Sequence, residues 1–225
     1  MIRGEATATS DLDLVVLFEN IDHAYRESFF HDGWPVEAFV HDEHSIEFYF
    51  IEKDLASGVG SLMWMVHEAE VLPGLTLLNR RVKQRADTLI ANGPAPWRAA
   101  EIDASRYAIT GLLDDLVPLA NGRGTERGGE YLAVVAAMHH AVGNHSLRCA
   151  GHWGATAKTI PRRLAVLDAD LARRFDDAFV AAFDGRVDRF VAFVDEILEA
   201  CGGRLFDGYS AHAERDAKRS PPPGA

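Results

Sequence analysis

Residues 10–18 read SDLDLVVLF, a stretch that puts two carboxylates at the start of an otherwise apolar segment. The run 14–18 has two β-branched valines and no polar side chain, which is typical of a strand buried on both faces. Alternate side chains of a strand share a face, so Asp11 and Asp13 point the same way, with Cα atoms about 6.5–7 Å apart. Carboxylates so placed repel each other and lose hydration if buried. The surrounding fold must therefore supply compensating charge.

A divalent cation between the two aspartates would remove both penalties. Magnesium prefers hard oxygen ligands, usually one or two carboxylates together with substrate phosphates. A second strand is predicted at 36–41, VEAFVH, where Glu37 is a lone acid among apolar residues. If the two strands are neighbours, Glu37 can reach metals held by Asp11 and Asp13. Two ions about 3.5–4 Å apart would then stabilise the attacking and leaving oxygens of a nucleotidyl transfer. The alternatives are a solvated helix cap for the aspartates and an exposed edge-strand position for Glu37.

The pattern along the chain predicts an α+β protein, a small mixed sheet followed by a helical bundle. We expect a catalytic domain at 1–74, a helical substrate-binding domain at 75–210 and a disordered tail at 211–225. In the first domain Asp32-Gly33 is a turn signal, 46–55 has helical spacing and 71–72 is a short third strand. The segment 41–44, HDEH, reads as a loop and helix cap. The later helices are predicted from apolar spacing and from proline positions, at 75–90, 104–117 (stopped by Pro118), 130–147, 161–172, 175–183 and 187–200.

Composition limits the partners. The 225 residues include 23 basic and 34 acidic side chains, a net charge of −11. That balance argues against a general nucleic-acid binder, which needs a basic surface for phosphates. No apolar run approaches the length of a membrane span and the N-terminus has no apolar signal core, so we expect a cytoplasmic protein.

The cysteines and histidines do not predict a site. Cys149 and Cys201 are far apart in the sequence, with neither disulfide-framework nor metal-ligand spacing, and we expect reduced thiols. Several histidines gather around the helix predicted at 130–147, but no carboxylate-histidine or cysteine pattern accompanies them. We therefore expect surface or interdomain histidines rather than a zinc site. They are His139, His140, His145 and His152.

The segment 3–14, RGEATATSDLDL, resembles the second half of the motif of the DNA polymerase beta-like nucleotidyltransferase superfamily. That motif is a Gly-Ser pair, several residues that often include Arg-Gly, and then Ser-Asp-x-Asp between apolar residues. A later acidic triplet is matched by Val36-Glu37-Ala38. The branch it resembles is the stand-alone bacterial enzymes similar to aminoglycoside nucleotidyltransferases, in which a helical substrate domain follows the catalytic one. The segment 153–164, WGATAKTIPRRL, is similar to a Trp…Lys…Arg segment of that second domain.

The resemblance implies a magnesium-dependent transfer of a nucleoside monophosphate, AMP from ATP, onto an acceptor hydroxyl with release of pyrophosphate. Asp11 and Asp13 are implied as ligands of a two-metal site, and Glu37 as the third acid, either a ligand or a base. Nucleotide-binding residues are implied beside the motif and in the later segment, where a lysine could reach the phosphates. They are Arg3, Gly4, Ser10 and Lys158.

The acceptor and the state of the motif remain open. The acidic balance suits a cationic small molecule such as an aminoglycoside, because opposite charge raises local concentration. An antitoxin-like partner that modifies or binds a protein is the alternative. The Gly-Ser pair that should precede Arg3 is absent. We expect the natural start to lie upstream, so that an extension restoring this turn raises activity. A chain truly lacking the turn would be an inactive nucleotide-binding module.

Overall fold

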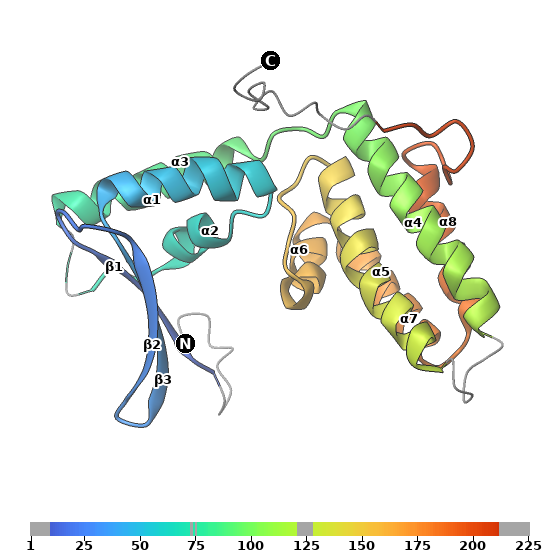
Figure 1. Ribbon diagram of the computed structural model, residues 1–225, viewed down its shortest axis with the longest axis horizontal. Helices are drawn as coiled ribbons and strands as arrows, with labels where there is room; N and C mark the ends of the chain where they lie inside the picture. Colours follow the sequence, from blue (N-terminus) through green and yellow to red (C-terminus); the bar gives the residue numbers. More distant parts are fainter. Residues whose placement is uncertain (1–9, 73, 75, 121–127, 212–225) are drawn as a thin grey trace, which may run out of the picture. The chain divides into compact units, whose positions relative to one another are not determined.

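The computed structural model describes residues 10–72, 74, 76–120 and 128–211 (Figure 1). The chain forms two compact units, of which the first comprises Met1–Trp97 and Ser146–Ala172 and the second Arg98–His145 and Arg173–Ala225. A small mixed sheet is followed by helices, which confirms the predicted α+β class. The boundary expected at 74/75 falls inside the first unit. Most of the tail expected at 211–225 lies outside the described residues.

The sheet has three strands in the order β1-β3-β2. Strand β1 (Leu12–Leu17) runs parallel to β3 (Trp34–His41), and β2 (Tyr25–His31) pairs antiparallel with β3. The predicted strand at 36–41 and the turn at Asp32-Gly33 are confirmed, and φ is positive at both turn residues, as this tight hairpin requires. Strand β2 had not been predicted, because its side chains are all exposed and carry no alternating apolar pattern.

Two strand predictions are wrong. Strand β1 is not buried on both faces: its side chains are half-buried or exposed, and Leu14 is 42% exposed. In the described part of the chain β1 pairs only with β3, so it is an edge strand there. The residues at 71–72 form no strand, because the chain bends there between two helices.

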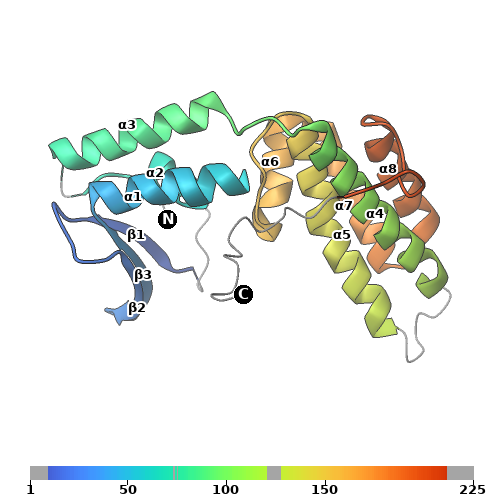
Figure 2. The ribbon, with the colours of Figure 1, turned by 45° about the horizontal axis from the view of Figure 1, so that its top comes forward.

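Helices cover one face of the sheet (Figure 2). The segment 41–44 does form a loop and a cap, since the Asp42 carboxylate accepts a hydrogen bond from Ser45 N at 2.8 Å and the Ser45 hydroxyl accepts one from Asp42 N. The predicted helical stretch 46–55 is confirmed as α1 followed by a π-helical turn, η1. Helix α2 had not been predicted. The four elements are α1 (Glu43–Tyr49), η1 (Phe50–Leu55), α2 (Ser61–Glu68) and α3 (Leu77–Asn92).

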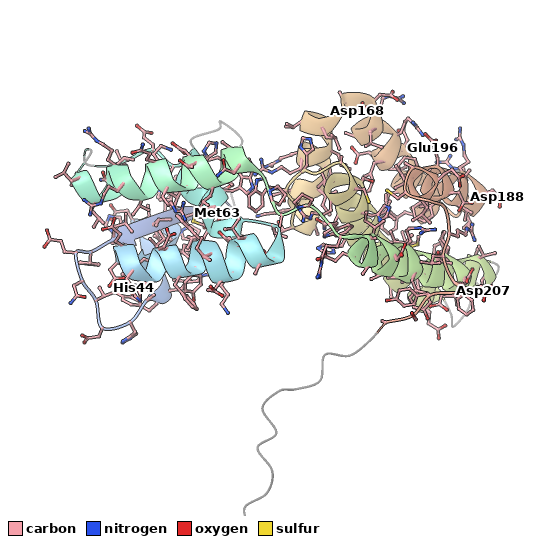
Figure 3. The ribbon with its side chains drawn as sticks, turned by 90° about the horizontal axis from the view of Figure 1, so that it is seen from above. His44, Met63, Asp168, Asp188, Glu196 and Asp207 are labelled. Atoms are coloured by element: carbon pink, nitrogen blue, oxygen red, sulfur yellow. The ribbon has the colours of Figure 1, made fainter. Side chains whose placement is uncertain are left out.

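The core of the first unit lies between this helical layer and the sheet. Phe50 and Met63 are fully buried in it, and Val15 and Phe39 pack against it from the strands. Figure 3 shows the contrast between Met63, among the helices, and the exposed His44. Burial of such side chains contributes about 1.5–3 kcal/mol each.

A distant segment returns to complete this core. Trp153 is buried in it and donates a hydrogen bond from its indole nitrogen to Ile90 O at 3.1 Å. Gly154 N donates to Gly58 O at 2.8 Å. Gly58 has φ +66, and a Cβ there would lie 3.1 Å from the Arg148 guanidinium, so glycine is the residue that fits. These contacts explain why 146–172 groups with the sheet rather than with the helical unit.

The second unit is built from long helices, whose fully buried side chains include Ile109, Phe175 and Phe190. Tyr131 is also fully buried, and its hydroxyl donates to Ala182 O at 2.6 Å. The remaining helices of the chain are α4 (Ala99–Ala120), α5 (Gly128–Cys149), α6 (Ile160–Leu167), α7 (Ala169–Phe183) and α8 (Val187–Glu199).

Two helix boundaries differ from prediction for local reasons. Helix α4 continues through Pro118, because a proline in the last turn interrupts little of the hydrogen-bond ladder. The helix predicted at 161–172 ends early, since the Asp168 carboxylate accepts hydrogen bonds from Asp170 N and Leu171 N and so begins α7. No helix in the described residues is long and apolar enough to cross a membrane.

Candidate functional site

The sheet brings together the three acids singled out from the sequence. Asp13 and Glu37 are direct Cα partners across the parallel pair β1–β3, and Asp11 precedes Asp13 by one strand repeat. One carboxylate oxygen from each of Asp11, Asp13 and Glu37 lies within 4.8 Å of the other two. The aspartates are exposed and Glu37 is half-buried. A single cation, or a close pair of cations, can therefore contact all three side chains.

The position of the group follows from strand alternation. Asp13 and Glu37 share a face with Val15 and Phe39, whose side chains pack against the helical core. Asp13 stands where β1 has just begun, at the end of this covered face. The carboxylates are thus fixed by a packed sheet while their oxygens remain reachable from solvent.

The electrostatics of Asp13 favour a bound cation. Partial burial raises the pKa of its carboxyl, and the negative charges of Asp11 and Glu37 raise it further. The positive charges of Lys158 and Arg26 act in the opposite direction. A metal ion between the three carboxylates would offset the repulsion and replace lost hydration. An all-oxygen set with this geometry fits magnesium, and Asp11, Asp13 and Glu37 are the residues that would hold it.

Arg26 is a member of the site that sequence reasoning missed. It lies on β2 opposite Phe39, two register positions from Glu37, and its guanidinium forms an ion pair with the Glu37 carboxylate. The same guanidinium stacks over the Phe39 ring, 4.8 Å from the ring centroid. Glu37 therefore already has a cationic partner that a metal would have to share or displace. The signal that could have found Arg26 is the Asp32-Gly33 turn, since a hairpin strand must precede it.

Lys158 lies in the same unit as the carboxylates. It is exposed on a short 3-10 turn, η2 (Ala157–Thr159), and close enough for its charge to lower the pKa of Asp13. The turn is held between Trp153, buried in the core, and helix α6. On α6 the Arg163 guanidinium lies 3.5 Å from the Trp64 ring centroid. The lysine thus adds a positive charge near Asp13 from an anchored backbone.

The other predicted nucleotide-binding residues are only partly covered by the structure. Ser10 is half-buried and directly precedes Asp11. Arg3 and Gly4 lie outside the described residues.

Comparisons with known proteins give a likeness among solved structures. No protein-family model matches the sequence, and no curated protein matches it. Among solved structures, the crystal structure of a nucleotidyltransferase-like protein from Exiguobacterium sibiricum 255-15 is similar at a TM-score of 0.46 and 12% identity. The match covers 84% of this chain and 61% of that chain, so this chain spans about three-fifths of its length.

Proposed function

We propose that the chain is a cytoplasmic, magnesium-dependent nucleotidyltransferase that moves a nucleoside monophosphate, AMP from ATP, onto an acceptor hydroxyl. The observation that carries the proposal is the convergence of Asp11, Asp13 and Glu37, with one ligand oxygen from each within 4.8 Å of the others. Three carboxylates on or next to neighbouring strands, with the charge of Lys158 nearby, suit a metal-bound triphosphate rather than an uncharged ligand.

Each residue has a defined part in the transfer. Asp11 and Asp13 orient the donor by holding its counter-ions, and Lys158 stabilises negative charge on the triphosphate as a compact cation. The acceptor oxygen bonds to the α-phosphorus, the bond from that phosphorus to the bridging oxygen breaks, and pyrophosphate leaves. Glu37 completes the ligand set or accepts the hydroxyl proton; these are the two alternatives for it. Magnesium, when bound, would screen the phosphate charge and polarise the α-phosphoryl group.

The acceptor is proposed to be a small cationic molecule of the aminoglycoside kind. The chain carries a net charge of −11, which raises the local concentration of a cationic acceptor. A protein acceptor is the other candidate that the assay below distinguishes.

The test is pyrophosphate release from each of the four nucleoside triphosphates, with magnesium and a panel of acceptors that includes aminoglycosides and candidate protein partners. Asp13→Asn is the inactivating variant. Asp22→Asn is the matched control, because Asp22 is an exposed carboxylate outside the cluster. Release by the wild type and by Asp22→Asn, but not by Asp13→Asn, supports the proposal. Equal release by all three proteins would refute the metal assignment, and nucleotide binding without any release would indicate a binding module.

A further inference from the structure

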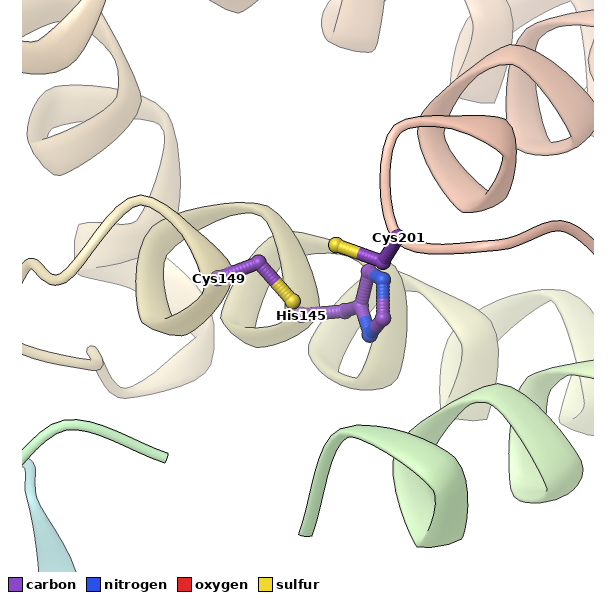
Figure 4. A group of neighbouring side chains, drawn as sticks. All are labelled: His145, Cys149 and Cys201. Atoms are coloured by element: carbon purple, nitrogen blue, oxygen red, sulfur yellow. The ribbon is translucent and has the colours of Figure 1, made fainter. Parts of the chain in front are cut away.

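A second group of metal-ligand side chains lies away from the carboxylates. His145 and Cys149 are one turn apart on α5, and Cys201 follows the end of α8 (Figure 4). An imidazole nitrogen of His145 lies within 4.8 Å of the sulfur of each cysteine. His145 and Cys201 belong to the second unit, and Cys149 is carried by the same continuous helix as His145. The two cysteines are reduced and half-buried, as expected, whereas His145 is buried rather than at the surface. Nothing in the sequence indicated that the three side chains lie together.

The surroundings of His145 hold its ring in one orientation, as metal binding requires. It is only 1% exposed, and its Nδ1 shares a hydrogen bond of 2.9 Å with Ser105 Oγ. A hydrogen bond at one ring nitrogen that orients the other toward a metal is typical of metal-bound histidines. Burial, assisted by the positive charge of Arg106, lowers the pKa of His145 to about 4.

Cys201 is held in place by its own turn. Arg106 on α4 donates from Nε to Gly203 O at 2.8 Å and from Nη2 to Gly202 O. Gly202 has φ +105, and a Cβ there would lie 3.2 Å from that guanidinium, so the close approach depends on glycine. Farther along, Leu205 N donates to the Thr110 hydroxyl at 3.0 Å. The thiol therefore sits on a turn fixed to α4, and fixed ligands make stronger sites because less ordering accompanies binding.

We propose that His145, Cys149 and Cys201 form a zinc-binding site that fastens the end of α8 to α5. Two thiolates and one imidazole are the soft donor set that zinc favours, and three protein ligands leave a fourth position for water. Both thiols are half-buried, so the ion can reach them without unfolding. Binding releases the two thiol protons to solvent, and no oxidant or reductant takes part.

Cobalt titration of the reduced full-length chain tests this site, because Co²⁺ bound by thiolates absorbs visibly and Zn²⁺ then displaces it. The variants are Cys149→Ser and Cys201→Ser, which conserve size. The control is His140→Asn, since His140 is an exposed histidine on the same helix. We expect one Co²⁺ per chain with sulfur-to-cobalt bands in the wild type and in His140→Asn. Each serine variant should lose at least tenfold in affinity, with unchanged helical circular dichroism.

Two results would overturn the site: no sulfur-to-cobalt band in the reduced wild type, or bands and affinity unchanged in both serine variants. The result is independent of the proposed enzyme activity, because Asp13→Asn should keep the cobalt bands.

Discussion

The two ligand groups of this chain differ in almost every physical respect. The carboxylate group consists of oxygens on neighbouring strands, is largely exposed, and is built by pairing register. The group of His145, Cys149 and Cys201 consists of nitrogen and sulfur, with a buried histidine and two half-buried thiols, and is built by helical spacing and one turn. The comparison teaches that one fold can offer two ligand groups whose donor atoms suit different kinds of metal. Hard, exposed carboxylates suit a cation that must also bind substrate, whereas sulfur and imidazole ligands suit zinc.

The sharpest test of that separation is Asp13→Asn. We expect magnesium-dependent pyrophosphate release to fall on the order of a thousandfold, equivalent to about 4 kcal/mol of transition-state stabilisation. The metal-free fold should be as stable as the wild type or more so, because the variant removes the partly buried Asp13 charge, which is repelled by Asp11 and Glu37. Parallel assays of turnover, thermal unfolding and Co²⁺ absorption decide the point. Loss of the cobalt bands in this variant would show that the two groups are not independent.

Zinc, but not magnesium, should stabilise the folded chain at the end of α5 and in the turn after α8. At about 100 times its dissociation constant, Zn²⁺ bound only to the folded chain adds about 2.7 kcal/mol to the free energy of unfolding. We expect the added protection to be local, so that amide hydrogen exchange slows at the end of α5 and in the turn after α8. Cys201→Ser should not gain this protection. An equal slowing of exchange by magnesium at these amides would show that the group of His145, Cys149 and Cys201 does not prefer zinc.

Lys158→Ala should weaken use of the triphosphate while leaving the metal ligands intact. The loss of one charged contact to phosphate predicts a roughly 10- to 100-fold rise in the KM for ATP. Lys158→Arg keeps the charge and should recover part of the loss. Mn²⁺ binding without nucleotide should change little in either variant. A KM unaffected by Lys158→Ala would remove this residue from the proposed site.

The smallest effect is expected at Arg26, where an internal cation competes with the metal for Glu37. In Arg26→Ala the affinity for Mn²⁺ should rise about twofold to fivefold, since exposed ion pairs are weak. Arg26→Lys retains a cation and is the matched control. Electron paramagnetic resonance of free Mn²⁺ gives the affinity without relying on turnover. Weaker binding in Arg26→Ala would mean that the arginine supports the carboxylate geometry instead.

The group of Asp11, Asp13 and Glu37 could be predicted because the pattern that places each acid lies within a single strand segment. Strand alternation places Asp11 and Asp13 on one face, and a lone acid in a second strand points to Glu37. Arg26 could not be read in the same way, because the exposed side chains of β2 give no periodic signal. The helical boundary at Asp168 was missed since a single capping carboxylate outweighed an apolar pattern that continues past it.

The second group was not predictable from spacing. His145 and Cys149 have helical spacing, but the third ligand comes from a turn far along the chain. Cys201 reaches the histidine only through tertiary packing. Arg106 donates hydrogen bonds to the carbonyl oxygens of Gly202 and Gly203 and so holds this turn in place. The grouping of Lys158 with the sheet has the same origin, because it depends on Trp153 entering a core made by residues between Ile46 and Leu89, far earlier in the chain.

The burial of Trp153 in that early core has a consequence for biosynthesis. The first unit is discontinuous, so a nascent chain that has emerged only as far as Trp97 lacks both the indole that fills the core and the turn that carries Lys158. The core beside the sheet is therefore complete only after the segment 146–172 has been made. Contacts between segments so far apart in the sequence form late and slow folding. Until they form, the apolar core surface that Trp153 covers stays exposed. We expect a fragment ending at Trp97 to expose this apolar surface and to bind chaperones.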